Sequence, residues 1–275
     1  MKTSVEHSAA KYDPQENFLV FAVNQQLFAL PHQKIISVLD NPASTMMPGM
    51  SDHARGVMNF MGEPVTYFDF RKILGEQSIR EEINELFDML LARKQDHLNW
   101  VSKLKEAVTN GTEITVQTNP HLCAFGKWYD GFQTENLALS RYLKKFDQPH
   151  QKIHALAIQA KGLISAGNAQ TALDMIHEAE NTVLAQLIRL FDEARDELQR
   201  ANTEYAIVTQ TDDMRKAAFA VDQPKYFGVL DEITHPLPKM VVQQSNGFVE
   251  ACGTLKVDDT NTEILIIELT KLISR

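Results

Sequence analysis

Two histidines four residues apart, His150 and His154, form the sequence pattern that most strongly suggests chemistry. Residues at this spacing share one face of a helix, and two imidazoles on one face can both reach a metal ion at about 2.0–2.1 Å. Asp147 and Pro149 precede the pair, which predicts a helix N-terminus capped by Asp147. Taken alone, such a pair belongs to an ordinary helix face more often than to a metal site.

Two further residues could complete a metal site with this pair. His97 lies in the middle of another predicted helix, and Cys123 lies in a segment rich in glycine and aromatic residues. Three imidazoles and one thiolate form a closed tetrahedral set, which suits Zn²⁺ better than Mg²⁺ or Ca²⁺. The simpler alternatives are that Cys123 is a small buried apolar residue and that Trp100 and Trp128 belong to the core.

The combination of these segments resembles the chemoreceptor zinc-binding (CZB) domain. That family has the patterns H-x-x-W, C-x-[LF]-G-x-W-[YF] and H-x-x-x-H in the same order and at similar spacing. The matching segments are His97-Leu98-Asn99-Trp100, Cys123-Ala124-Phe125-Gly126-Lys127-Trp128-Tyr129 and His150-Gln151-Lys152-Ile153-His154. The resemblance covers about residues 80–200. It implies a four-helix-type bundle, commonly a homodimer, with zinc held by His97, Cys123, His150 and His154.

Two other histidines of this region, His121 and His177, match no ligand position of the family. His121 is close enough to Cys123 in sequence to remain an alternative ligand.

The predicted elements follow the order β, α, β. Residues 17–75 contain short β-rich runs separated by glycine and proline, and residues 79–201 have apolar positions at helical spacing. Strand-like runs return from about residue 203. We expect the first long helix to end at Asn110-Gly111 and the last to begin after Ala166-Gly167-Asn168.

A single β domain with a helical insertion explains this order more economically than two β domains, because about 60 residues bury little core. The first and last helices would each be about 45 Å long, and an antiparallel arrangement brings Arg80 and Ala201 to the same end. We therefore expect a flexible tail at residues 1–16, a β domain at 17–78 and 202–275, and a bundle at 79–201. The alternative is three modules in series.

The β segments give a second resemblance, to the CheW-like adaptor domain. Its signature is similar to Arg55-Gly56-Val57-Met58-Asn59-Phe60-Met61-Gly62-Glu63-Pro64-Val65-Thr66-Tyr67-Phe68-Asp69-Phe70-Arg71, in which Gly56, Asn59, Gly62 and Asp69 match. Met61 stands where the family usually has Arg, and Thr66 replaces the usual Pro. Residues 218–222, 249–253 and 264–269 resemble its later strands. The structural alternative is a generic β-barrel in which the matched residues only maintain the fold.

Together, the resemblances imply an α+β multidomain chain, with a CheW-like double β-barrel domain interrupted by an antiparallel four-helix-type bundle. The double barrel would consist of two small five-stranded subdomains. The CheW resemblance also implies partner binding by Gly56, Asn59, Gly62 and Asp69, with a CheA-type histidine kinase and a chemoreceptor as partners.

The composition limits the classes of partner and compartment. Of 275 residues, 44% are hydrophobic and 23% charged, and the net charge of −9 argues against nucleic acid or an anionic membrane as the main partner. No apolar run reaches the ~18–20 residues needed to span a bilayer, and the polar first residues lack a signal sequence. We therefore expect a cytoplasmic protein in which Cys123 and Cys252 stay reduced, with Cys252 a buried strand residue.

The sequence shows no catalytic machinery. It contains neither a phosphate-binding G-x-x-x-x-G-K-[ST] loop nor a G-x-S-x-G elbow, and four protein ligands would close a zinc site to substrate. We expect a non-enzymatic signalling adaptor that couples zinc or oxidant sensing to a chemoreceptor–CheA complex. The alternatives are a constitutive scaffold with a purely structural zinc and, with less support, a zinc-dependent enzyme.

Overall fold

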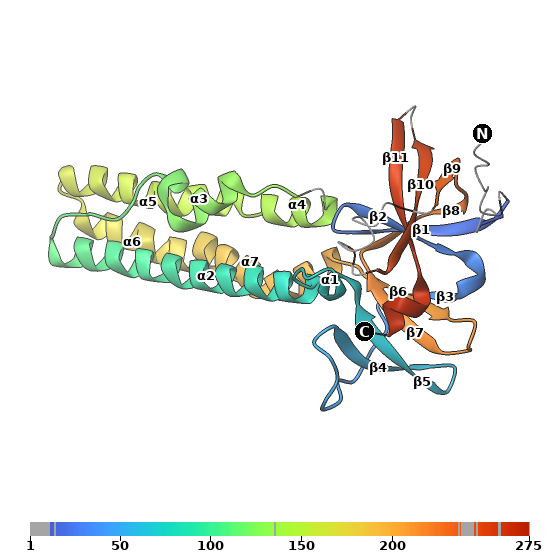
Figure 1. The fold of residues 1–275 in the computed structure, drawn as a ribbon. Coiled ribbons are helices and arrows are strands. Elements are labelled where there is room, and N and C mark those ends of the chain that lie inside the picture. The colour runs from blue at the N-terminus through green and yellow to red at the C-terminus, as the bar shows by residue number, and fades with distance from the viewer. Residues whose placement is uncertain are drawn as a thin grey trace, which may run out of the picture. The chain divides into compact units, whose positions relative to one another are not determined.

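The structure is a computed structural model that describes residues 12–13, 15–134, 136–235, 237, 245, 247–257 and 260–274. The chain forms two compact units, Met1–Ser78 with Thr203–Arg275, and Ile79–Asn202 (Figure 1). The tail predicted at residues 1–16 falls mostly outside the described residues, although Tyr12 is buried and its ring lies 5.7 Å from that of Phe18. Among the described helices, none has the length and apolar character required to cross a membrane.

The first unit contains two β-sheets. One has the strand order β8-β1-β2-β11-β10-β9 and the other the order β3-β6-β7-β5-β4. The strands of the first sheet are β1 (Asn17–Val23), β2 (Gln26–Pro31), β8 (Gln223–Val229), β9 (Glu232–Thr234), β10 (Val249–Val257) and β11 (Thr260–Ile267). Those of the second are β3 (Ile35–Asp40), β4 (Ala54–Phe60), β5 (Glu63–Asp69), β6 (Tyr205–Gln210) and β7 (Lys216–Val221).

Each sheet combines strands from before and after the helical segment. In the first sheet β2 pairs in parallel with β11, where Phe28 lies opposite Leu265. In the second, β5 pairs in parallel with β7 and β3 pairs antiparallel with β6. Neither sheet would be complete without both parts of the chain. The prediction of one β domain interrupted by helices is therefore confirmed, in place of three modules in series.

The predicted double barrel is wrong in one respect, because the described sheets are open rather than closed. A barrel closes only when its first and last strands pair, and in the described residues no ladder joins β8 to β9 or β3 to β4. The first sheet also has six strands instead of five. Alternating apolar residues predict strands, but which edges pair depends on contacts between distant parts of the chain.

Strand β1 is buried on both faces because apolar clusters lie on either side of it. Leu19, Phe21 and Val23 belong to a core shared with the second sheet through Ile207 and Phe219. The alternate residues of β1 face a separate cluster. Two short helices, α1 (Phe70–Ile73) and α9 (Leu269–Ile273), add to the shared core, and a 3₁₀ turn at His32–Lys34 joins β2 to β3.

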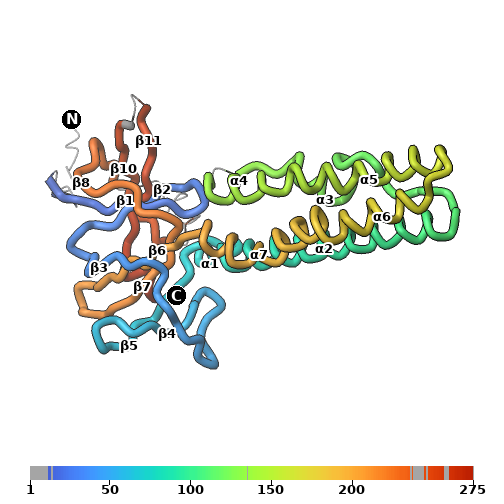
Figure 2. Tube along the Cα trace, turned by 180° about the vertical axis from the view of Figure 1, so that it is seen from behind, coloured from blue at the N-terminus to red at the C-terminus, as the bar shows by residue number. Residues whose placement is uncertain are grey.

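The second unit is an antiparallel bundle of four consecutive chain segments, or legs, which Figures 1 and 2 show from opposite sides. Helix α2 (Ile79–Asn110) forms the first leg, and an irregular segment, η2 (Pro120–Leu122) and α3 (Ala124–Gly131) form the second. Helices α4 (Leu137–Lys144) and α5 (Asp147–Ser165) form the third. Helix α6 (Ala169–Ala179), the π-helical segment η3 (Glu180–Leu184) and α7 (Ala185–Ala201) form the fourth. The predicted four-helix-type bundle is thus confirmed.

Helices α2 and α5 end just before the glycines that predicted their C-termini, but α5 lacks the predicted N-terminal cap. Gly111 and Gly167 follow α2 and α5 in the left-handed conformation, with φ of 63° and 78°. The predicted Asp147 cap is wrong, because the preceding residues are already helical and Phe146 occupies the cap position without a side-chain hydrogen bond. Asp147 is instead the first residue of α5, where its charge favours the helix N-terminus.

Arg55 binds one acidic residue from the chain before the helical segment and one from the chain after it. Nε of Arg55 donates to Asp69 at 2.8 Å, and Nη1 donates to Glu204 at 2.9 Å. Asp69 ends β5 and caps α1, while Glu204 directly precedes β6. All three side chains are at most 10% exposed, so the carboxylates depend on this guanidinium to balance their buried charge.

Replacing Arg55 should destabilise the β unit strongly. Arg55→Met leaves two buried carboxylates without their cation, and we expect a loss of about 3–5 kcal/mol in the free energy of unfolding. Urea denaturation followed by circular dichroism measures this loss. Arg215→Met is the control, because the ion pair of Arg215 with Asp213 is exposed and should contribute at most about 1 kcal/mol. Equal losses of unfolding free energy in the two variants would show that the buried ion pairs of Arg55 contribute no more than an exposed pair.

Candidate metal centre

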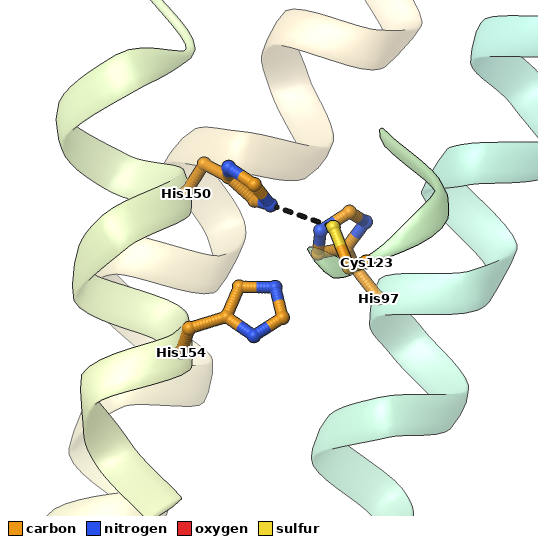
Figure 3. A group of neighbouring side chains, drawn as sticks. All are labelled: His97, Cys123, His150 and His154. Carbon is orange, nitrogen blue, oxygen red and sulfur yellow. Dashed lines mark hydrogen bonds between the residues drawn. The ribbon is translucent and has the colours of Figure 1, made fainter. Parts of the chain in front are cut away.

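Four side chains from three legs of the bundle converge at one point in its core: His97, Cys123, His150 and His154. The nearest nitrogen or sulfur atoms of these residues all lie within 4.8 Å of one another. His150 and His154 project from adjacent turns of α5 and face His97 on α2, with Cys123 approaching from the start of α3 (Figure 3). Sγ of Cys123 lies 3.2 Å from Nε2 of His150.

The three imidazoles are buried far more deeply than polar rings usually are. Exposed fractions are 3% for His97, 5% for His150 and 1% for His154. A buried polar atom costs free energy unless it has a partner. The hydrogen bonds of these rings therefore indicate what the site can hold.

Two of the histidines have their ring tautomer fixed by backbone carbonyl groups. Nδ1 of His97 lies 2.7 Å from the carbonyl oxygen of Arg93, and Nδ1 of His154 lies 2.8 Å from that of Gln117. A carbonyl oxygen only accepts, so each Nδ1 carries the proton and each Nε2 keeps its lone pair. These two Nε2 atoms are buried and have no hydrogen-bond partner among the described residues. Metal-binding histidines typically donate their other ring N–H to a carbonyl or carboxylate in this way.

The surroundings keep the imidazoles neutral. Burial lowers the pKa of His97 and His154, and burial together with the neighbouring His97 and His154 lowers the pKa of His150 to about 3. Burial also raises the pKa of the Cys123 thiol. The metal-free site is therefore a set of three neutral imidazoles and one thiol, and binding a cation would release the thiol proton.

The donor set and its spacing fit Zn²⁺. Bond lengths of about 2.0–2.3 Å in a tetrahedron place the donor atoms about 3.3–3.7 Å apart. The observed upper limit of 4.8 Å thus requires the donors to move together by about 1 Å. Nitrogen and sulfur donors suit zinc, whereas Mg²⁺ and Ca²⁺ prefer oxygen. Four protein donors would fill a tetrahedral zinc site and would leave no position open for a substrate.

Gly126 allows Cys123 to reach the site. A Cβ atom at this position would lie 1.9 Å from the carbonyl oxygen of Pro120, so only glycine lets α3 pack against η2. Cys123 is the N-cap of α3, and its Sγ accepts a hydrogen bond of 3.2 Å from the amide of Gly126. The glycine of the sequence pattern therefore determines where the sulfur lies.

Aromatic rings enclose the four donors. The ring of Phe125 lies 4.9 Å from that of His150, and the ring of Phe191 lies 5.8 Å from that of His97. Trp100 lies 5.1 Å from His154. The sequence patterns include Phe125 and Trp100 but not Phe191, which lies on α7, far from His154 in the sequence. The helical spacing of Leu187, Leu190 and Phe191 could have placed that face in the core.

The alternative ligand His121, the remaining bundle histidine His177 and the second cysteine lie outside this cluster. His121 is exposed, and its Nδ1 lies 2.9 Å from Asp130. His177 is also exposed and lies beside Glu180. Cys252 is on β10 in the β unit, so the predicted strand position is confirmed, but the residue is only partly buried.

The four residues predicted to bind a partner each have a role in the fold. Gly56 has φ of 128°, and a Cβ there would lie 2.3 Å from the carbonyl oxygen of Thr45. The Asn59 side chain accepts a hydrogen bond of 2.9 Å from the amide of Gly62, whose φ is 88°. Asp69 caps α1 and binds Arg55. These contacts give the β4–β5 hairpin its shape, and Met61 at its tip is 89% exposed.

Comparison with known proteins identifies two domain families along the chain. The CheW-like domain matches residues 17–97, and the chemoreceptor zinc-binding domain matches residues 97–161. A search of curated proteins found no match. Among solved structures, the chain is similar to the crystal structure of scaffolding protein TtCheW from Thermoanaerobacter tengcongensis, with 13% identity, a TM-score of 0.41, and coverage of 92% of this chain and 89% of that one. The chain thus combines a CheW-like domain with a chemoreceptor zinc-binding domain.

Proposed function

We propose that this protein is a cytoplasmic signalling adaptor that binds Zn²⁺ through His97, Cys123, His150 and His154. In this proposal, zinc or oxidant sensing at that site is coupled to a chemoreceptor–CheA kinase complex. One observation carries the zinc assignment: four donor atoms converge in an apolar core, and two of them are buried imidazole nitrogens with no partner in the described part of the chain.

The adaptor role is inferred from the family of the β unit. CheW-like domains interact with chemoreceptors and CheA and have no enzymatic activity, and we extend both properties to this chain. We propose that Gly56, Asn59, Gly62 and Asp69 serve partner binding by shaping the β4–β5 hairpin, with Met61 at its exposed tip. The proposal also includes a homodimer formed through the helical bundle.

Zinc binding would link three legs of the bundle at one point. His97 belongs to α2, Cys123 to the turn before α3, and the histidine pair to α5. A bound cation supplies a common positive centre for these donors, so that metal affinity becomes part of the stability of the bundle. Helix α2 begins at Ile79 and α7 ends at Ala201, where the chain returns to the β unit, so a change in the bundle has two covalent routes to the adaptor.

Oxidation of Cys123 would provide a second input. The sulfur is half-buried, unlike the rings of the histidines. As a thiolate it can attack one oxygen of hydrogen peroxide: an S–O bond forms, the O–O bond breaks, and the departing hydroxide takes a proton and leaves as water. The sulfur is oxidised by two electrons to a sulfenic acid and the peroxide is reduced, which would weaken metal binding.

A purely structural zinc is the second candidate. The same geometry supports it, because the donors lie within the bundle core and join three of its legs. The two functions differ in the consequence of metal loss: a structural site predicts an unfolded bundle, whereas a sensing site predicts a folded bundle with altered partner binding.

Replacing Cys123 should weaken zinc binding. Cys123→Ser removes the only sulfur donor of the cluster, and we expect zinc affinity to fall at least about tenfold. Cobalt substitution should also lose the charge-transfer absorption of a cobalt–thiolate bond. The matched control is Cys252→Ser, on β10, which should retain the affinity and the spectrum. Equal zinc affinity in Cys123→Ser and the unaltered protein would disprove the ligand assignment.

Metal removal should separate sensing from scaffolding. We expect chelation to lower the melting temperature while preserving most helical circular dichroism, and to change co-sedimentation with chemoreceptor and CheA at least severalfold. Loss of the helical signal would instead favour the structural zinc. Unchanged co-sedimentation with a folded bundle would rule out zinc sensing.

Adding a methyl group at Gly126 should displace Cys123. Because a Cβ there would lie 1.9 Å from a backbone oxygen, Gly126→Ala must separate α3 from η2, and we expect zinc affinity to fall at least about tenfold. Isothermal titration measures the change. Gly131→Ala in the same helix is the control, since a Cβ there meets nothing within 4 Å and zinc affinity should stay the same. An unaltered affinity in Gly126→Ala would show that the turn does not position the sulfur.

A further inference from the structure

One backbone carbonyl group, that of Gln117, receives two hydrogen bonds beside the metal centre. Nε1 of Trp100 donates to it at 2.9 Å, and Nδ1 of His154 donates to it at 2.8 Å. A carbonyl oxygen has two lone pairs, so these two donors use its full capacity. The indole and imidazole rings also pack together, with centroids 5.1 Å apart.

The position of this carbonyl determines the tautomer and orientation of His154. With its proton held on Nδ1, the ring presents the Nε2 lone pair as the atom available to a metal. If the carbonyl moved away, His154 would lose the partner that distinguishes its two ring nitrogens.

Gln117 lies in an irregular segment and depends on side-chain contacts for its position. The segment between α2 and η2 has no helix or strand, and Gln117 itself is exposed. Its side chain accepts a hydrogen bond of 2.9 Å from the amide of Asn119. Asn119 in turn caps η2, the turn that leads directly to Cys123. Trp100 therefore holds the segment between α2 and η2 in place. The Gln117 carbonyl of this segment contacts His154, and the segment leads through η2 to Cys123.

We infer that Trp100 is a positioning residue of the metal centre, acting through the Gln117 carbonyl on His154 and on the turn that carries Cys123. Trp100 lies one helical turn after His97 on α2. Helix α2 thus contributes one ligand directly and holds two others in place through the indole N–H. This inference rests on the proposed zinc site and adds to it a residue that does not touch the metal. The competing interpretation is that Trp100 only fills the core.

Trp100→Phe tests this role, because it keeps an aromatic ring and removes the N–H. We expect the dissociation constants for zinc and cobalt to rise about tenfold or more. Nitrogen NMR of the metal-free protein should show His154 losing its preference for the Nδ1–H tautomer, a readout that core packing alone would not change. Unchanged affinity together with an unchanged His154 tautomer would overturn the inference.

Trp128→Phe is the matched control. Trp128 packs against Phe125 and Phe132 in the same bundle, but no described residue accepts a hydrogen bond from its indole. The Trp128→Phe variant should retain both the metal affinity and the His154 tautomer. An equal effect in both variants would mean that ring size, not the N–H, matters.

A second variant at position 100 and a zinc titration of the unaltered protein complete the test. If Trp100→Phe fails to fold, benzothienylalanine at position 100 preserves the shape of the indole and replaces its N–H by sulfur, and the same loss is expected. The unaltered protein is titrated in parallel: if it binds no zinc, the proposed function fails. If it binds zinc and the variants match it, only the role of Trp100 fails.

Discussion

The core of the bundle accommodates three deeply buried imidazoles beside one half-buried thiol. Buried polar rings are costly unless each nitrogen has a partner. The chain pairs Nδ1 of His97 and His154 with backbone carbonyls and gathers one ring nitrogen of each histidine near the sulfur of Cys123. Such a set is unfavourable as an ordinary core and favourable as a binding site. The aromatic rings of Phe125, Phe191 and Trp100 surround this set of donors.

A different constraint governs the β unit, whose sheets need strands from both ends of the chain. The parallel pairs β2–β11 and β5–β7 form only when the segments before and after the bundle lie together. Arg55 reinforces this arrangement by binding Asp69 at the end of β5 and Glu204 at the start of β6. The ion pairs of Arg55 therefore join strands that precede the helical segment to a strand that follows it.

The sequence predicted the four donor side chains of the site but not the backbone carbonyls and the distant ring that surround them. The family resemblance carried by these residues implied the four donors that the structure brings together, and helical periodicity predicted the bundle. The carbonyls of Arg93 and Gln117 were missed because every residue has one and no sequence pattern distinguishes it. Phe191 was missed because it approaches from a distant helix. The closed barrels and the Asp147 cap were wrong since strand closure and helix starts depend on neighbours that periodicity does not reveal.

The two family signatures in this chain encode different kinds of information. In the zinc-binding pattern, the histidines and the cysteine are conspicuous because their side chains would do the chemistry, while Gly126 and Trp100 only position them. In the CheW-like pattern nearly all matched residues have backbone roles: Gly56 admits a close strand contact and Asn59 closes a turn. Matching residues there establish the shape of a hairpin and not what it binds. Met61, where the pattern departs, lies at the exposed tip of this hairpin together with the exposed Glu63 and Pro64.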